Sequence, residues 1–291
     1  MTQETLEKEP QTLQQVYFQQ SNLNRLELCM KGEDYPVSML FSGPPGTGKT
    51  TTAKNFINAV RCINRPKHSP YPCGECDVCR SDPRQLPSSS NVLWIQRGNE
   101  QNLTQQLKEI SDFIEQVPEG YGFFGQQEHT NRKFVVVDEL WNLADTQIAR
   151  LLYNAELYGL LKRNKVTFIL VTMNESALKD VTREALVSRC EPFYFLPPNQ
   201  EQIKRYLKEQ YGEHPEESLE LIAKACNNNL REAISQMNVC LKTERARLEK
   251  EGLSEEPTLN PRTVADHLHY FDDAKRIELW NLVQGKNAKN F

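Results

Sequence analysis

The sequence lacks the long apolar run that a membrane-spanning helix requires. No stretch of its 291 residues approaches the ~20 consecutive apolar positions needed to cross a bilayer. Residues 1–5 also lack the basic and apolar segments of a secretion signal. We therefore expect a protein with no membrane partner.

An excess of basic charge is missing as well. The chain has 35 Lys and Arg against 39 Asp and Glu, which gives a net charge of −4. This balance argues against a protein coated with nucleic-acid-binding charge, although a local basic surface stays compatible with it. The length allows roughly two domains. An apolar content of 38% is sufficient for packed cores.

The strongest motif is an octapeptide that fits the G-x-x-x-x-G-K-[ST] phosphate loop at every position. The apolar stretch 37–42 before it predicts a buried strand, and residues 51–60 after it predict the first turns of a helix. Strand, loop and helix in this order are the context that the motif requires. A Gly- and Pro-rich surface turn that matches by chance is the less favoured alternative. The motif consists of Gly43, Pro44, Pro45, Gly46, Thr47, Gly48, Lys49 and Thr50.

This loop predicts a site for a nucleoside triphosphate. Its glycines allow backbone N–H groups to turn toward a polyphosphate, and the start of the helix adds partial positive charge. We expect Lys49 to reach the β- and γ-phosphates, and the Thr50 hydroxyl to bind Mg²⁺. We also assign the next residue, Thr51, to the nucleotide-binding set.

An acidic pair follows a second apolar strand. Segment 133–139 contains three valines and one phenylalanine, predicts a buried strand and ends in Asp138 and Glu139. We expect Asp138 to hold Mg²⁺ directly or through water, and Glu139 to polarise the attacking water. Such a pair is common by itself, but after a phosphate loop at this separation it is a strong signal.

Four of the eight cysteines have the spacing of a metal site. Two overlapping C-x-x-C pairs and one upstream cysteine can close a tetrahedral site with no position open for water, which is typical of structural zinc. A redox dithiol and scattered core cysteines are the alternatives. The proposed ligands are Cys62, Cys73, Cys76 and Cys79. We expect the others to be buried small residues: Cys29, Cys190, Cys226 and Cys240.

Further apolar segments predict the rest of the sheet. Strands are expected at 91–95, 166–172 and 192–196, a helix at 103–117, and a loop at 120–132. Pro197 and Pro198 break the chain, and the residues from 199 onward have helical character. Strands that alternate with helices predict an α/β fold with a parallel sheet covered on both faces, followed by a separate helical domain.

Together these motifs resemble the gamma/tau ATPase subunit of the bacterial DNA polymerase III clamp loader, within the AAA+ superfamily. The resemblance covers roughly residues 8–285. It is most specific where the phosphate loop is combined with the cysteine-rich segment 72–80. Two shorter motifs, at 188–190 and 229–233, also carry it.

The resemblance implies the domain organisation. Residues 1–197 would form a AAA+ parallel-sheet phosphate-loop domain with a zinc-binding insert at 62–79. An all-helical lid domain would follow at 198–250. Residues 251–291 would be a linker and the start of a truncated, collar-like third helical domain.

Three further site residues gain roles only from the resemblance. Arg189 resembles the arginine finger that reaches the ATP of a neighbouring subunit, where its guanidinium would neutralise developing phosphate charge. Arg231 resembles the second sensor, which contacts nucleotide from the lid domain. The first sensor falls on Asn174 or Thr172, and we favour Asn174 because an amide can orient a water molecule.

The resemblance also implies function and partners. It implies a cytoplasmic ATPase of a bacterial cell or virus-infected bacterial cell, with ATP, Mg²⁺ and Zn²⁺ as cofactors. Its partners would be other clamp-loader subunits in a ring-like hetero- or homo-oligomer, a sliding clamp and primer–template DNA. Segments 8–12 and 149–158 depart from the family pattern near the adenine pocket and on the DNA-facing helix. A nucleotide-switched interaction protein that does not load clamps is therefore the alternative.

Overall fold

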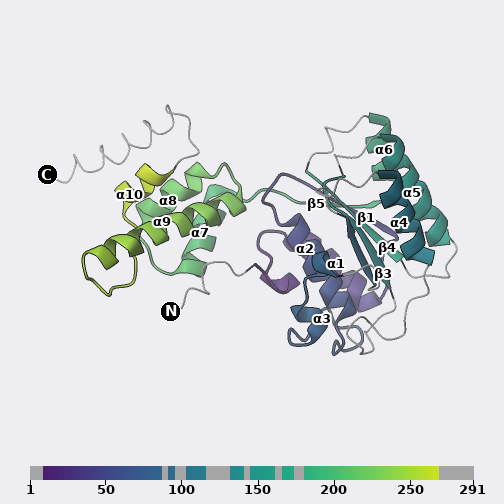
Figure 1. The fold of residues 1–291 in the computed structure, drawn as a ribbon, viewed down its shortest axis with the longest axis horizontal. Helices are drawn as coiled ribbons and strands as arrows, with labels where there is room; N and C mark the ends of the chain where they lie inside the picture. The colour runs from purple at the N-terminus through teal and green to yellow at the C-terminus, as the bar shows by residue number, and fades with distance from the viewer. Residues whose placement is uncertain are drawn as a thin grey trace. The chain divides into compact units, whose positions relative to one another are not determined.

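The computed structural model describes residues 9–86, 91–95, 103–115, 132–140, 145–160, 166–173 and 180–268. The chain forms two compact units, which divide between Leu196 and Pro197. The first unit combines helices and strands, and the described part of the second is helical (Figure 1).

The first unit contains a five-stranded sheet. Its strands lie in the order β2-β3-β4-β1-β5, and all four neighbouring pairs are parallel. This confirms the predicted α/β class with a parallel sheet. The elements are α1 (Gln20–Gly32), β1 (Ser38–Ser42), α2 (Lys49–Arg61), α3 (Asp77–Arg80), β2 (Val92–Ile95), α4 (Leu103–Glu115), β3 (Lys133–Val137), α5 (Asp145–Leu160), β4 (Val166–Thr172), α6 (Asp180–Arg189) and β5 (Glu191–Tyr194).

Helices cover both faces of this sheet (Figure 1). On one face, Met39 and Phe41 of β1 belong to the cluster that contains the buried side chains of α1 and α2. On the other face, Leu40 belongs to the cluster that contains those of α4, α5 and α6. Because successive side chains of a strand point to opposite faces, one short apolar strand contributes to two cores.

Helix α6 is an element that the sequence did not predict. Among its described side chains only Thr182 and Leu186 are buried, so its apolar face is too narrow to produce a clear helical pattern. The loop predicted at 120–132 lies outside the described residues except for Arg132. The predicted last strand begins one residue earlier than expected, at Glu191, and ends at Tyr194.

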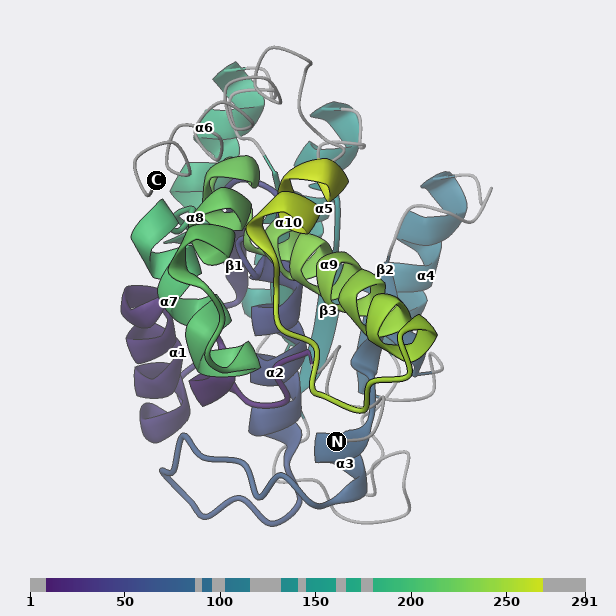
Figure 2. The same ribbon diagram turned by 90° about the vertical axis from the view of Figure 1, so that its left-hand side faces the viewer.

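The described part of the second unit contains helices α7 (Gln200–Tyr211), α8 (Glu216–Ala225), α9 (Leu230–Lys250) and α10 (Pro261–His267). Helix α10 contacts α8 and α9, which lie beside it in Figure 2. Asn199 begins α7 with a capping box, since its side chain accepts from the Gln202 N–H and the Gln202 side chain accepts from the Asn199 N–H. No helix in the described part of the chain is both long and apolar enough to cross a membrane.

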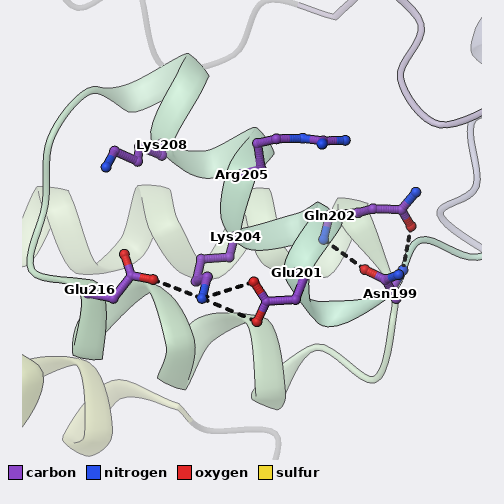
Figure 3. Close-up of a pocket in the computed structure, with 7 residues that line it drawn as sticks. All are labelled: Asn199, Glu201, Gln202, Lys204, Arg205, Lys208 and Glu216. Carbon is purple, nitrogen blue, oxygen red and sulfur yellow. Dashed lines mark hydrogen bonds and ion pairs between the residues drawn. The ribbon is translucent and has the colours of Figure 1, made fainter.

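A surface depression of about 530 Å³ lies along α7 (Figure 3). Lys204 is at its centre and forms ion pairs with Glu201 and Glu216, at 3.1 and 2.8 Å. These neighbours raise the pKa of Lys204 to about 12. The Lys204 ammonium group is thus already paired with carboxylates of the protein. We therefore assign no ligand to this depression.

Candidate functional site

The phosphate loop connects β1 to α2 and closely approaches the backbone that follows β5. A Cβ atom added to Gly43 would lie 2.1 Å from the Phe195 carbonyl oxygen, which is far inside van der Waals contact. Gly48 has a φ of +88° immediately before α2 begins. Both positions therefore require glycine, one for space and the other for backbone conformation.

Lys49 and Thr47 have side chains that turn back onto the loop. The Lys49 ammonium donates to the carbonyls of Gly43 and Pro44, at 2.6 and 2.7 Å. The Thr47 hydroxyl donates to the Pro44 carbonyl at 2.8 Å. The loop therefore holds the ammonium group against its own backbone carbonyls.

The two residues assigned to magnesium are in direct contact. The Thr50 hydroxyl donates to Oδ2 of Asp138 at 3.1 Å. The other carboxylate oxygen, Oδ1, accepts from the Glu139 N–H at 3.0 Å. A threonine hydroxyl and a carboxylate are both oxygen ligands of the type that Mg²⁺ prefers, so the donor set fits this ion.

Glu139 has a left-handed backbone conformation. Its φ is +61°, which is uncommon for a residue with a side chain and is found more often at functional sites. The side chain is exposed, whereas the strand before it is fully buried. This sharp exit from β3 presents the carboxylate beyond the carboxyl end of the sheet.

Thr172 is the last residue of β4 and lies opposite Ser42 of β1. It is fully buried, and its hydroxyl has no hydrogen-bond partner among the described residues. Strand β4 lies between β1 and β3, so this hydroxyl is located between the strands that lead to the phosphate loop and to Asp138. Asn174, the favoured first sensor, lies outside the described residues.

The two arginines assigned by resemblance are in different units. Arg189 ends α6, and its Nε is 2.9 Å from a carboxylate oxygen of Glu156 on α5. These side chains remain 42% and 49% exposed, so the ion pair lies at the surface. Arg231 is exposed in the first turn of α9, which begins after the capping residue Asn229.

The four predicted metal ligands form one cluster, with all four sulfur atoms within 4.8 Å of one another. The Cys62–Cys73, Cys73–Cys79 and Cys62–Cys76 sulfur distances are 3.5, 3.9 and 3.9 Å. Four thiolates at ~2.3 Å from a zinc ion, at the corners of a tetrahedron, are about 3.8 Å apart. The cluster therefore fits a tetrahedral metal site.

Proton sharing in the cluster favours a thiolate at Cys62. A hydrogen bond from Cys79 lowers the pKa of the Cys62 thiol to about 5, although burial opposes this shift. The same hydrogen bond, together with burial, raises the pKa of Cys79. Outside the cluster, Cys190, Cys226 and Cys240 are buried as predicted, whereas Cys29 is half-buried.

The sequence reasoning missed Glu9, whose carboxylate contacts three side chains around α2. It accepts from the Thr51 hydroxyl at 3.2 Å and from the Lys54 ammonium at 2.9 Å. It also lies 3.3 Å from Arg84, which follows the cysteine cluster. Thr51, assigned to nucleotide binding from the sequence, thus has a protein partner that no local motif indicates.

Gln19 was also missed as a site residue. It is 4% exposed, and its side-chain amide donates to the Thr47 carbonyl in the phosphate loop at 3.2 Å. The sequence showed only a Gln-Gln pair at this position. A hydrogen bond to a backbone carbonyl has no sequence signature, so only the fold reveals this contact.

The strand order, the phosphate loop after β1 and the acidic pair after β3 define a AAA+ fold. Solved structures agree with this class. Cdc6p from Pyrobaculum aerophilum matches with a TM-score of 0.58 and 14% identity, over 95% of this chain and 74% of that chain. A RuvB variant from Thermotoga maritima matches with a TM-score of 0.59 and 16% identity, over 96% and 80%. Identities this low show the fold alone.

Residues 18–199, more than half of the chain, match the family described as DNA polymerase III, delta subunit. The chain belongs to this family, which confirms the resemblance to clamp-loader subunits. It is 27% identical over 230 residues to DNA polymerase III subunit tau of Bacillus subtilis, covering 78% of this chain and 37% of that protein. It is 26% identical over 231 residues to Replication factor C small subunit of Aeropyrum pernix, covering 78% and 58%.

The chain spans about one third of the length of the tau subunits that it matches. For Escherichia coli tau, at 26% identity, the matched region is 32% of that protein and 78% of this chain. The family match over residues 18–199 includes the phosphate loop and the sheet of the first unit.

Proposed function

We propose that this chain is an ATP-hydrolysing subunit of a clamp loader, which helps to place a sliding clamp on primed DNA. The contact between Thr50 and Asp138 is the observation that carries the proposal. It joins the two motifs that a phosphate-loop ATPase needs at one point in space. The membership in a DNA polymerase III subunit family supports the clamp-loading role.

Each residue of the site has a defined role in this proposal. Backbone N–H groups of 43–50 and the Lys49 ammonium would bind the phosphates of ATP. Thr50 and Asp138 would hold Mg²⁺, which supplies charge neutralisation of the phosphates when it is bound. Glu139 would accept a proton from the attacking water.

The first sensor has two candidates, Asn174 and Thr172, and one observation supports a role for Thr172. Thr172 has a buried hydroxyl without a partner among the described residues, at the end of the strand between the two motifs. A buried polar atom of this kind costs free energy unless a ligand or water satisfies it. We therefore propose Thr172 as a γ-phosphate contact, alongside Asn174.

The two arginines would act from different places. Arg231 would contact nucleotide bound to its own subunit, from a lid domain that we place at 198–250. Arg189 would reach the ATP of a neighbouring subunit in the ring. The surface ion pair with Glu156 contributes about 1 kcal/mol or less, so it can be exchanged for a phosphate without large cost.

The cysteine cluster would bind one structural zinc ion. All four coordination positions would be occupied by protein sulfur, so the ion would have no open position for substrate. Its role would be to stabilise the insert at 62–79, which follows α2 directly. We further propose that 1–197 form the nucleotide-binding domain and that 251–291 form a linker and the start of a collar-like domain.

A second function is favoured by one observation on α5. Its solvent-facing side includes Tyr153, 64% exposed, and Leu157, 40% exposed. By the resemblance, this helix faces DNA in clamp loaders, yet neither of these two side chains carries a positive charge that would attract phosphate. They suit a protein partner better, which supports a nucleotide-switched interaction protein that does not load clamps.

One experiment separates the two functions. ATP hydrolysis is measured for the purified chain with its partner subunits, with and without primed DNA and clamp. A clamp loader should hydrolyse ATP several-fold faster when both are present. Hydrolysis that neither DNA nor clamp changes would favour the interaction protein.

A further inference from the structure

Helix α1 follows the outer edge of β5, the strand at one end of the sheet. Three polar side chains donate to backbone carbonyls of β5 and the residues just after it. The donors begin with the residue before α1 and occur at every third position, and the carbonyls occur at every second position. The helix and the strand thus run in opposite directions along a shared set of hydrogen bonds. The pairs are Gln19 with Leu196 at 2.9 Å, Asn22 with Tyr194 at 2.8 Å, and Arg25 with Pro192 at 2.6 Å.

Among these three side chains, only Gln19 is also bonded to the phosphate loop. Its Nε2 donates to the Thr47 carbonyl at 3.2 Å as well as to the Leu196 carbonyl at 2.9 Å. A primary amide nitrogen has two hydrogens, so it can satisfy both carbonyls at once. Gln19 and Thr47 are both 4% exposed, so water has little access to the hydrogen bond between them.

The backbone after β5 also lies against the beginning of the phosphate loop. The Phe195 N–H donates to the Ser42 carbonyl at 2.7 Å, one residue before the loop begins. The close approach between Gly43 and the Phe195 carbonyl adds a second contact there. Segment 195–196 therefore touches the loop directly at its start and, through Gln19, at Thr47.

Leu196 is the last residue of the first unit, from which the chain continues into the second unit at Pro197. We infer that Gln19 is a positioning residue that couples the conformation of the phosphate loop to this connection. When nucleotide changes the position of the Thr47 carbonyl, the shared amide transmits the change to Leu196. This inference rests on the proposed nucleotide-binding function.

The position requires a side-chain N–H donor, because two carbonyl groups accept from it. Leucine has nearly the same volume as glutamine but no N–H, so Gln19→Leu leaves the buried Thr47 carbonyl and the part-buried Leu196 carbonyl without their donor. Asn22→Leu is the matched control, because it removes one donor from the same helix edge and leaves the phosphate loop untouched. Both variants should lower the melting temperature.

The test compares the affinity for a fluorescent ATP analogue with thermal stability for the full chain. Gln19→Leu should weaken the affinity about tenfold, because a lost buried hydrogen bond has this order of effect. Asn22→Leu should keep the affinity within about twofold at a similar loss of melting temperature. The inference would be overturned if both variants lost affinity to the same extent for the same loss of melting temperature.

Hydrogen exchange provides the second measurement. In the wild-type protein, nucleotide should change the exchange of the Leu196 and Asn199 amides, which follow the residue that the loop contacts directly. This change should persist in Asn22→Leu and disappear in Gln19→Leu at saturating analogue. If Gln19→Leu retains it, the coupling role is wrong. A wild-type chain that binds no nucleotide would instead refute the proposed function, and this inference with it.

Discussion

Thr50 donates a hydrogen bond to Asp138 across 3.1 Å, although 88 positions separate the two residues in the sequence. The contact exists because β1 and β3, which precede these residues, both pair with β4 and point in the same direction. Parallel strands bring their carboxyl ends to one edge of a sheet, where ligands of α/β folds bind.

Lys49→Ala should abolish ATP binding. The variant removes the cation that the loop holds between the carbonyls of Gly43 and Pro44, and the phosphates lose their main positive partner. Equilibrium binding of a fluorescent ATP analogue measures the effect. Lys31→Ala, on the exposed side of α1, is the control and should bind like the wild type. Unchanged binding by Lys49→Ala would contradict the site.

Glu139→Gln should retain ATP binding and slow hydrolysis by about 10²-fold or more, since it removes only the base that polarises water. Steady-state phosphate release and analogue binding are measured on the same preparation. An amide has almost the same size as a carboxylate, so the fold should be unchanged. Wild-type hydrolysis by this variant would show that Glu139 has another role.

The purified chain should contain one zinc ion per molecule. Cys76→Ser should reduce the metal content and lower the melting temperature, because a closed thiolate site contributes folding free energy. Cys29→Ser is the control, since this cysteine lies outside the cluster and should leave the metal content unchanged. Elemental analysis without metal, together with reversible disulfide formation, would favour the redox alternative.

Arg189→Ala should not affect ATP binding by the isolated chain, but it should slow hydrolysis in an assembled ring. An arginine finger contributes about 10³-fold or more to the rate. Glu156→Gln is the informative companion, because it removes the ion-pair partner of Arg189 without removing the guanidinium. It should hydrolyse ATP at least as fast as the wild type. An isolated monomer whose activity depends on its own Arg189 would rule out the role in a neighbouring site.

Gly43→Ala should destabilise the first unit and weaken nucleotide binding. The added Cβ would collide with the Phe195 carbonyl, a backbone atom that cannot move by rotation of a side chain. Overpacking of this kind costs about 1–3 kcal/mol or more. Gly32→Ala, the last residue of α1, has ample space and should be neutral or stabilising by about 0.5–1 kcal/mol. Equal melting temperatures for both variants would contradict the close approach.

The sequence was sufficient for the parts of the site that local chemistry determines. A phosphate loop needs glycines, lysine and threonine within eight positions, and a closed zinc site needs its cysteines at short spacing. Such constraints appear as motifs, and the apolar strands between them determine the parallel sheet. This is why the contact between Thr50 and Asp138 could be anticipated.

The partners of Glu9 and Gln19 could not be predicted in the same way. Glu9 contacts Lys54 and Arg84, which come from separate parts of the first unit. Gln19 contacts two carbonyl groups, which every residue type has. Only tertiary packing selects these partners, so their positions follow from the fold rather than from a pattern.

The hydrogen bonds along the outer edge of β5 have a consequence for association with other chains. An edge strand usually offers unpaired backbone groups that a strand from another molecule can join, which leads to aggregation or unintended pairing. Here Arg25 and Asn22 already occupy the carbonyls of Pro192 and Tyr194, and Pro192 has no N–H to donate. Helix α1 therefore shields this edge from strand addition. A neighbouring subunit that approaches from this side must bind through side chains, and the sheet cannot continue from one molecule into the next at β5.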